Sequence, residues 1–295
     1  MRIIDVHAHV WIHDQEYPWA IEESDIPKND ARPDALIEMM KKNGVEHTVL
    51  VQYIKYKWDN RYVAHVMKRY PSLFMGVCRV DPKSPAGLDE LSYWTIEHGF
   101  KGVRFGSLPE KQSDWFKPHL LIPYFKLAAT LKIPVIMLMT PSRLPDLVKI
   151  LEQVPDVDVV IDHLADYLDK SNGDLKKLLA IARYPRVYLK LSHVALNSLE
   201  SFPWRDTYDS MKQVFQIYGT HRVIWGSDWP FSLSTMTYDQ SISYVLNEMK
   251  FLTQEDCEWI LGKTALQIWP FEEMGENNTQ KVLDVSIGKP DVKPF

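Results

Sequence analysis

The chain has 295 residues, of which 45% are hydrophobic and 25% are charged, and its formal net charge is −5. This is the composition of an ordinary globular protein, and a chain of this length buries a sizeable core without disulfides or a structural metal. No basic block is present, which argues against nucleic acid as a partner. The chain has no apolar run long enough to span a membrane and no signal-peptide pattern at its charged start. We therefore expect no membrane association and a cytoplasmic location.

Short apolar runs rich in β-branched residues alternate along the chain with longer segments of helical periodicity. The runs typical of strands are residues 3–7, 48–52, 74–80, 100–105, 134–139, 157–162, 187–192 and 222–227. The segments typical of helices are residues 33–43, 60–70, 85–97, 122–132, 143–152, 175–183, 206–218, 238–251 and 254–268. Pro33 and Gly44 mark the start and the end of the first of these helices.

This order predicts an α/β protein with a parallel sheet that is covered by helices on both faces. Eight strands favour closure into a (β/α)8 TIM barrel, which typically needs about 250 residues. The first strand is not followed by a glycine-rich phosphate turn, which argues against a dinucleotide-binding fold. We expect one domain over residues 1–271. Residues 272–295 are expected to form a tail that is disordered or packs on the barrel or on a partner subunit, and such a tail is compatible with a homodimer.

Ionisable side chains follow three of the predicted strands. His7 and His9 end the first strand and share one face, because side chains alternate along a strand. His163 ends the sixth strand, and Asp228 follows the eighth. Catalytic groups of such barrels lie where the strands end, and closure makes the first and eighth strands neighbours. We therefore expect these four side chains to converge on one point.

Three imidazole nitrogens and one carboxylate oxygen suit one divalent metal ion, Zn²⁺ or Mn²⁺, with a position left open for water. The ion would acidify that water and polarise a substrate carbonyl, with Asp228 as the general base. The same four residues can also work without metal, Asp228 then activating water directly while the histidines polarise the carbonyl. The competing interpretation is structural, since a lone His-x-His on a strand is a weak signal. His163 and Asp228 at matching strand ends reverse that preference.

Other side chains at the predicted mouth are candidates for substrate contact. Arg104 is expected to point into the mouth and would hold a substrate carboxylate or other substrate oxygens, or else form a salt bridge with a neighbouring acid. Arg79 is a weaker candidate of the same kind, and Gln52 and Tyr53 would hydrogen-bond a polar substrate. Flat aromatic rings that suit a planar or sugar ring lie in the loops at Trp11, Trp19, Tyr56, Trp115 and Trp229, although each alone is more typical of packing. The loop 11–32 is expected to form a lid or a pocket wall. The remaining histidines, apart from His193, are expected at the surface: His13, His47, His65, His98, His119 and His221.

Several motifs together make a specific resemblance. They are Asp5-Val6-His7-Ala8-His9-Val10-Trp11, Tyr17-Pro18-Trp19, Lys101-Gly102-Val103-Arg104, Ile161-Asp162-His163-Leu164, Leu189-Lys190-Leu191-Ser192 and Trp225-Gly226-Ser227-Asp228-Trp229-Pro230. In this order, over nearly the whole chain, they resemble the sugar-lactonase-like and pyrone dicarboxylate lactonase-like branch of the amidohydrolase superfamily. The resemblance implies a distorted barrel, a small-molecule substrate and hydrolysis of a lactone of the sugar-acid, muconolactone or pyrone type. It carries over His7, His9, His163 and Asp228 as active-site residues and leaves the metal open, since some relatives bind one divalent ion and others none.

The sequence departs from the wider superfamily at two places. The fifth strand ends without a lysine suited to carbamylation, so a two-metal centre is not expected. The seventh ends in Ser192-His193, and His193 is a candidate for a substrate contact, a metal-adjacent group or a packing residue. Two other functions remain open at this point. One is metal-dependent decarboxylation of an aromatic or unsaturated acid, and the other is a non-catalytic binding protein on the same scaffold.

Overall fold

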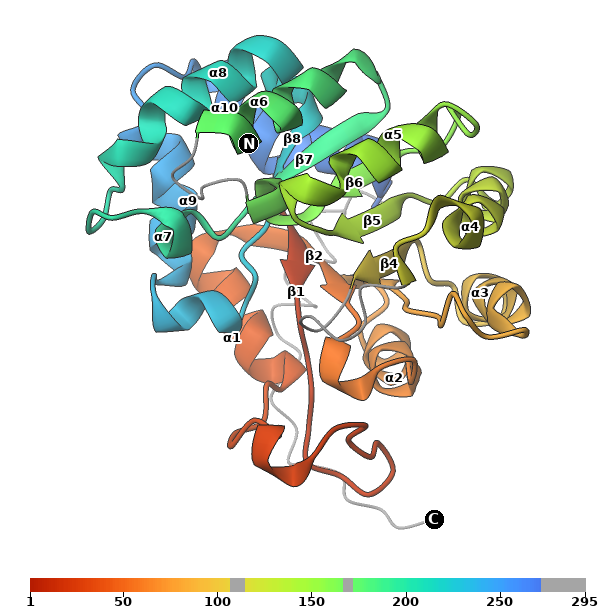
Figure 1. Cartoon of the computed structure of the whole chain (residues 1–295). Helices are drawn as coiled ribbons and strands as arrows, with labels where there is room; N and C mark the ends of the chain where they lie inside the picture. Colours follow the sequence, from red (N-terminus) through yellow and green to blue (C-terminus); the bar gives the residue numbers. More distant parts are fainter. Residues whose placement is uncertain (107–114, 167–171, 272–295) are drawn as a thin grey trace.

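The computed structural model describes residues 1–106, 115–166 and 172–271, and within these ranges strands and helices alternate along the chain (Figure 1). The strands of the described chain are β1 (Ile3–Ala8), β2 (Val45–Val51), β3 (Phe74–Val77), β4 (Val103–Gly106), β5 (Val135–Leu138), β6 (Val159–Ile161), β7 (Val187–Leu191) and β8 (Val223–Trp225). Each falls on a predicted strand, although most are shorter at one or both ends.

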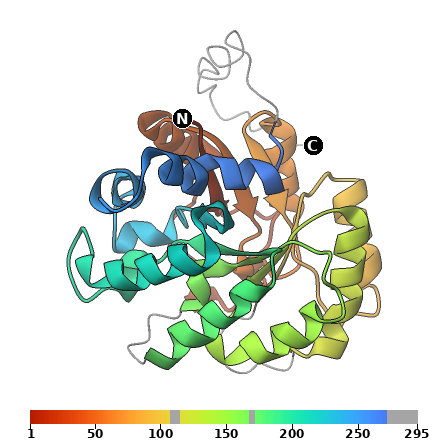
Figure 2. The ribbon, with the colours of Figure 1, turned by 90° about the horizontal axis from the view of Figure 1, so that it is seen from above.

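Helices follow the strands as expected and form an outer ring around them (Figure 2). The helices of the described chain are α1 (Pro33–Asn43), α2 (Arg61–Arg69), α3 (Gly87–Ile96), α4 (Pro118–Leu131), α5 (Leu144–Leu151), α6 (Asn172–Ala180), α7 (Val194–Asn197), α8 (Tyr208–Tyr218), α9 (Tyr238–Ser243), α10 (Gln254–Glu258) and α11 (Thr264–Ile268). Pro33 begins α1, and Gly44 ends it with the left-handed backbone that glycine adopts without strain. Two differences stand out, since the sequence did not predict α7 and π-helical turns interrupt the last two predicted helices.

The parallel strands of the described chain lie in two sheets, of order β1-β2-β3 and β4-β5-β6-β7-β8. Single bridges join the sheets at both seams. Cys78 pairs with Val103 where β3 meets β4, and Ala8 pairs with Trp229 where β1 meets the segment after β8. At the second seam the His9 amide donates to the Trp229 carbonyl, and the Asp228 amide donates to the His7 carbonyl. The predicted fold, a distorted (β/α)8 barrel, is therefore confirmed.

An apolar layer fills the interior of the ring. Its members are fully buried aliphatic side chains from the strands: Ile4, Val6, Val49, Val51, Val77, Ile136, Val160 and Ile224. Burying each contributes about 1.5–3 kcal/mol, so this layer holds the strands at fixed spacing beneath the polar residues that end them.

The chain following α11 closes the amino-terminal end of the barrel. Trp269 joins the interior layer and donates from Nε1 to the Lys101 carbonyl, just before β4. Phe271 stacks on His47 with ring centroids 4.4 Å apart. His47 is buried, so the expectation that it lies at the surface is wrong, because the aromatic end of the chain covers it. The other five histidines of that group are exposed, as expected.

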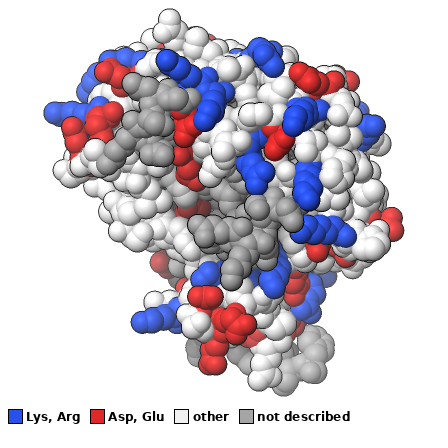
Figure 3. Space-filling view, viewed as in Figure 1, with Lys and Arg blue, Asp and Glu red and all other residues white. Residues whose placement is uncertain are grey.

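Acidic and basic side chains are interspersed over the described part of the face in Figure 3. None of the helices in the described ranges has the length and apolar character of a membrane span. The predicted tail, residues 272–295, lies outside the described residues.

Candidate active site

An irregularity in β1 positions its two histidines. Asp5 pairs with Thr48 and Ala8 with Leu50, so three steps along β1 match two steps along β2. The extra residue is a β-bulge, which changes the direction of the following side chains. Ile4 and Val6 belong to the interior layer, and regular alternation would turn His7 away from it. Instead His7 also faces the ring, next to His9.

Asp5 fixes the bulge from the opposite side of β1. Its carboxylate accepts from the amides of His7 and Ser227, from the Ser227 hydroxyl and from the Tyr238 hydroxyl. The same side chain thus binds β1, the segment after β8 and α9. It keeps His7 and Asp228 at a constant separation across the seam.

Three polar atoms converge at the carboxyl end of this seam. The Nε2 atoms of His7 and His9 lie 3.0 Å apart, and Asp228 Oδ1 lies 3.4 Å from the first and 3.3 Å from the second. All three side chains are buried. Nitrogen ligands on a tetrahedral zinc ion, with bonds of about 2.0–2.1 Å, lie about 3.3–3.4 Å apart. The three atoms are therefore spaced as ligands of one small divalent ion.

Two of the histidines are held through their other ring nitrogen. His9 Nδ1 lies 2.7 Å from the Val51 carbonyl, and His163 Nδ1 lies 2.7 Å from Ser192 Oγ. A proton on His9 Nδ1 donates to that carbonyl and leaves a lone pair on Nε2, and the serine can fix His163 in the same tautomer. His163 is buried with its ring centroid 5.0 Å from that of His7. The four residues predicted from the sequence, His7, His9, His163 and Asp228, thus lie together. Each of them belongs to at least one group of three side chains whose ligand atoms are close enough to bind one metal ion.

His193 binds the second oxygen of Asp228. Its Nε2 lies 2.6 Å from Asp228 Oδ2, and its ring stacks on that of His163 with centroids 3.5 Å apart and planes at 2°. Burial lowers the pKa of His193, but hydrogen bonds with Asp166 and Asp228 outweigh it and raise the pKa to about 9. Burial raises the pKa of Asp228, while hydrogen bonds with His193 and His9 hold it well below its usual value. His193 and Asp228 therefore form an ion pair at neutral pH.

Several residues of this cluster have left-handed backbones. The φ angles are 52° at His163, 61° at His193 and 53° at Asp228. Such conformations cost about 1–3 kcal/mol each in residues other than glycine, and they concentrate at functional sites. The backbone strain is consistent with side chains placed for chemistry rather than for packing.

Sequence reasoning missed a buried pair of charges beneath the histidines. Lys190 and Asp162 are fully buried, with Nζ 2.7 Å from Asp162 Oδ1, and Arg104 Nε lies 2.8 Å from Asp162 Oδ2. Burial raises the pKa of Asp162, but Lys190 and Arg104 lower it more, so the carboxylate stays ionised. A lysine inside the apolar run of β7, two residues before Ser192 on the same face, was the signal that marked an inward charge.

Lys190 and Asp162 offer His7 Nδ1 a hydrogen-bond donor and an acceptor, so each tautomer of His7 has a partner. Lys190 Nζ lies 2.9 Å from His7 Nδ1, and Asp162 Oδ1 lies 3.4 Å from the same atom. If Lys190 donates to Nδ1, the proton of neutral His7 sits on Nε2 and points toward His9 and Asp228. If Nδ1 carries the proton and faces Asp162, Nε2 is free to bind a metal. Both tautomers have a partner in place.

Aromatic rings form one wall beside His9. Trp11 stacks on Tyr53 with centroids 4.4 Å apart, Trp19 stacks on Tyr56 at 4.5 Å, and Phe231 lies 5.4 Å from the His9 ring. The loop 11–32 therefore folds against the segment after β2. The buried Tyr53 hydroxyl has no hydrogen-bond partner within the described residues. Burial raises the pKa of Tyr53, and the charge of Asp228 adds to this shift.

The other predicted contact residues are placed as follows. Gln52 is buried and donates to the Asp59 carbonyl, while its Oε1 has no partner within the described ranges. Trp229 is buried in the hydrophobic core. It contacts the site through its backbone carbonyl, which accepts a hydrogen bond from the His9 amide. For Arg104 the sequence left two roles open, substrate contact and a salt bridge with a neighbouring acid. In the structure it forms a salt bridge with Asp162.

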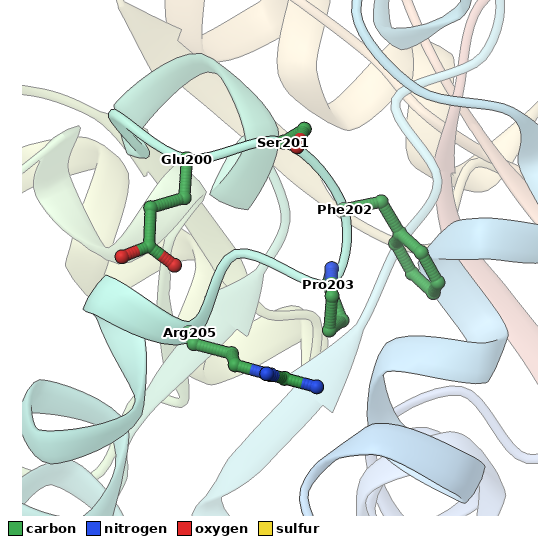
Figure 4. Close-up of a pocket in the computed structure, with 5 residues that line it drawn as sticks. All are labelled: Glu200, Ser201, Phe202, Pro203 and Arg205. Carbon is green, nitrogen blue, oxygen red and sulfur yellow. The ribbon is translucent and has the colours of Figure 1, made fainter.

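Two hollows lie outside the histidine cluster. An open depression of ≈ 430 Å³ is lined by Glu200, Ser201, Phe202, Pro203 and Arg205. Figure 4 shows these side chains along a single loop, and none of them belongs to the cluster. A second cavity, of ≈ 290 Å³, lies among the loops after β2, β3 and β4 and includes Arg79. Only the second is built around a buried charge.

Comparison with known proteins shows the family of this chain and several of its relatives. The amidohydrolase family matches residues 4–271. L-fucono-1,5-lactonase of Burkholderia ambifaria is 27% identical over 78% of this chain and 80% of its own. The 4-sulfomuconolactone hydrolase of Hydrogenophaga intermedia is 25% identical over 77% of this chain and 74% of its own.

Solved structures show the same fold. A putative 2-pyrone-4,6-dicarboxylic acid hydrolase of Pseudomonas putida has a TM-score of 0.78 at 21% identity and covers 92% of this chain and 98% of its own. An amidohydrolase of Burkholderia multivorans with bound zinc has a TM-score of 0.73 at 21% identity and covers 92% of this chain and 100% of its own.

Proposed function

This chain belongs to the amidohydrolase family and is a hydrolase, and from that premise we propose that it opens a small lactone by attack of water on the ring carbonyl. Asp228 is the general base in this proposal. The observation that carries it is the convergence of His7, His9 and Asp228, with mutual distances of 3.0–3.4 Å, next to His163. The lactonases among its relatives support a lactone as the substrate.

Asp228 offers one oxygen for proton transfer. His193 binds Oδ2, so the oxygen left to take a proton from water is Oδ1, the atom that faces His7 and His9. The carboxylate is ionised at neutral pH, which a resting general base requires. Asp166 and the stacked His163 ring hold His193 in place, so the proton acceptor keeps one orientation.

The residues fit one divalent ion, Zn²⁺ or Mn²⁺. His7, His9 and Asp228 form one metal-compatible group and would hold it, and His163, which falls in such groups with His7 and with Asp228, would be the further ligand. When bound, such an ion would polarise the lactone carbonyl and acidify a water molecule. The ligand spacing, the anchored Nδ1 atoms of His9 and His163, and the acceptor beside His7 Nδ1 support this assignment.

The same residues can stabilise the oxyanion without metal. With Lys190 donating to His7 Nδ1, His7 presents an Nε2 proton toward the mouth of the barrel. That proton, together with the unpartnered Tyr53 hydroxyl, can hydrogen-bond the oxygen on which charge develops. Asp228 then activates the water alone.

The test measures whether the purified protein hydrolyses any of a panel of lactones. Hydrolysis is detected by the proton that it releases. The panel contains an aldono-1,5-lactone, muconolactone and 2-pyrone-4,6-dicarboxylate. We expect Asp228→Asn to lower kcat by at least about 100-fold, the usual contribution of a general base. Asp239→Asn removes an exposed carboxylate on α9 and serves as the matched control, with activity unchanged. Carbon dioxide release without proton release would identify a decarboxylase instead, and inactivity toward the whole panel would contradict the proposal.

Metal analysis decides between the two routes. Zinc or manganese near one atom per chain, with activity lost on chelation and restored by the ion, would support the metal-bound site. An active preparation that contains no metal would support the metal-free route.

A further inference from the structure

Arg79, just after β3, is a buried cation that uses little of its hydrogen-bonding capacity. Its Nη2 donates to the Gly106 carbonyl at 2.6 Å. Nε and Nη1 are buried and have no acceptor within the described residues. A guanidinium has five N–H donors, and buried donors without partners are rare in native proteins. The free donors therefore point to a ligand.

Arg79 also lacks a counter-charge among the described residues. Within the described chain, no carboxylate lies at ion-pair distance from it, and the nearby Asp162 is bound by Arg104 and Lys190. Burial, together with the charge of Arg104, lowers the pKa of Arg79 to about 9. An unpaired buried charge costs several kcal/mol, and a bound anion would remove that cost.

The cavity around Arg79 has room for such an anion. It measures ≈ 290 Å³, and the described residues of its wall include the basic side chains of Arg79, Lys57 and Lys83 and one acid, Asp81. Trp58 lies under the guanidinium, 5.3 Å from its central carbon to the ring centroid, and holds it in place. We name this space the Arg79 cavity.

The Arg79 cavity opens on the same end of the barrel as the histidine cluster. It lies among the loops that follow β2, β3 and β4. Arg104 and Asp162 are near enough to act on the pKa of Arg79, and Asp162 Oδ1 lies 3.4 Å from His7 Nδ1. We place the substrate along this end of the barrel, with its carbonyl at His7 and a substituent that extends past Arg104 and Asp162 toward Arg79.

We propose that the Arg79 cavity binds a carboxylate group of the substrate, so that this chain acts on carboxylate-bearing lactones rather than on neutral sugar lactones. The proposal deepens the lactone hydrolysis proposed above and rests on it. A neutral hydroxyl in the cavity would leave the charge of Arg79 uncompensated, whereas a carboxylate accepts from its free donors and balances that charge.

The kinetic test compares muconolactone with its methyl ester, which differ in one charge. For the wild type we expect kcat/KM to be at least about 10-fold higher for the acid. Hydrogen bonds to charged groups contribute about 1.5–3 kcal/mol, so Arg79→Gln should lower kcat/KM for the acid by about 10–150-fold. The same variant should change kcat/KM for the ester by less than about 3-fold, because the ester makes no charged contact.

A second variant guards against misfolding of Arg79→Gln. Lys57 and Lys83 are exposed, so Lys57→Ala/Lys83→Ala keeps the core intact. It should weaken the preference for the acid, most strongly at low salt, where exposed charges are least screened. The control is Lys250→Ala, an exposed lysine outside the cavity, which should keep the full preference.

Calorimetric titration with glutarate measures the cavity without turnover. We expect the wild type to bind glutarate, and Arg79→Gln to bind it at least about 10-fold more weakly. If no lactone is hydrolysed while glutarate binding depends on Arg79, the proposed function fails and the anion site stands. If acid and ester are hydrolysed equally well and Arg79→Gln changes neither rate, the function stands and the anion site is overturned. Absent glutarate binding, or equal binding by both proteins, also overturns the anion site.

Discussion

Within the candidate site, hydrogen-bond partners fix the side chains of His9, His163 and Asp228, while His7 has a partner for either tautomer. His9 and His163 are fixed through Nδ1, Asp228 is fixed through Oδ2, and His7 lies between Asp228 on one side and Lys190 with Asp162 on the other. The histidines and Asp228 could be found from the sequence, because they end strands that a closed ring brings together. Lys190 and Asp162 could not be paired in this way, since their contact depends on how the inward faces of β6 and β7 meet.

The ion pair of His193 with Asp228 makes stability depend on pH. The pKa of His193 is about 9 in the folded chain and about 6.5 in an unfolded one. Protonated His193 therefore contributes stability that is fully present below about pH 6.5 and is lost as the pH rises through about 9. The expected loss is on the order of 2–3 kcal/mol.

Urea unfolding at pH 6.5, 8 and 9.5 measures this loss. We expect the free energy of unfolding of the wild type to fall across the series. His193→Gln keeps a hydrogen-bond donor but does not titrate, so its free energy of unfolding should vary less. Parallel curves for the two proteins would show that His193 does not carry the effect.

At the level of the elements, β8 is shaped to leave room for β1. Gly226 follows β8, and a Cβ built at this position would lie 2.8 Å from His7 Cβ and 3.2 Å from the His7 backbone nitrogen. The absence of a side chain lets His7 approach Lys190 and Asp228. The glycine belongs to the Trp225-Gly226-Ser227-Asp228 motif, and its role follows from this close approach.

Gly226→Ala should therefore displace His7. We expect a stability loss of about 1–3 kcal/mol from overpacking, and a fall in kcat/KM of at least about 10-fold, because misplacement by about 1 Å can cost 100-fold. The matched control is Gly44→Ala at the end of α1, where φ is +67° and no atom lies within 4 Å of the added carbon. That variant should lose about 1 kcal/mol of stability through backbone strain and keep its activity. Full activity in Gly226→Ala would contradict the assignment.

The order of strands and helices could be predicted from the sequence, and each difference between prediction and structure has a physical cause. The strands are buried on both faces, so they are continuous apolar runs, and α1 has Pro33 and Gly44 at its ends. The bulge in β1 was not predictable, because the residues between Asp5 and Ala8 carry no glycine or proline that would mark it. His47 was misplaced because its cover, Phe271, comes from the far end of the described chain.

Over the whole molecule, stability and chemistry are separated between the two ends of the barrel. Trp269 and Phe271 close the amino-terminal end, while the histidines, Asp228 and the Arg79 cavity lie at the carboxyl end. Such a division is general for this fold and allows the loops to change without loss of the core.

Trp269→Phe tests this separation. It removes the hydrogen bond to the Lys101 carbonyl and part of a fully buried ring, so we expect the free energy of unfolding to fall by about 1–3 kcal/mol. The kcat/KM should stay within about 2-fold of the wild type, because the active end keeps its geometry. Urea midpoints and lactone kinetics on the same preparation measure both quantities. A parallel loss of activity would mean that the two ends are coupled.

The seam between β1 and β8 gives the site a second role. His7 and His9 belong to the three-stranded sheet and Asp228 follows the five-stranded one, while within the described chain a single bridge pairs Ala8 with Trp229 there. A ligand that bound residues on both sides would hold the two sheets together across this seam. By mass action, its binding would raise the free energy of unfolding of the whole barrel.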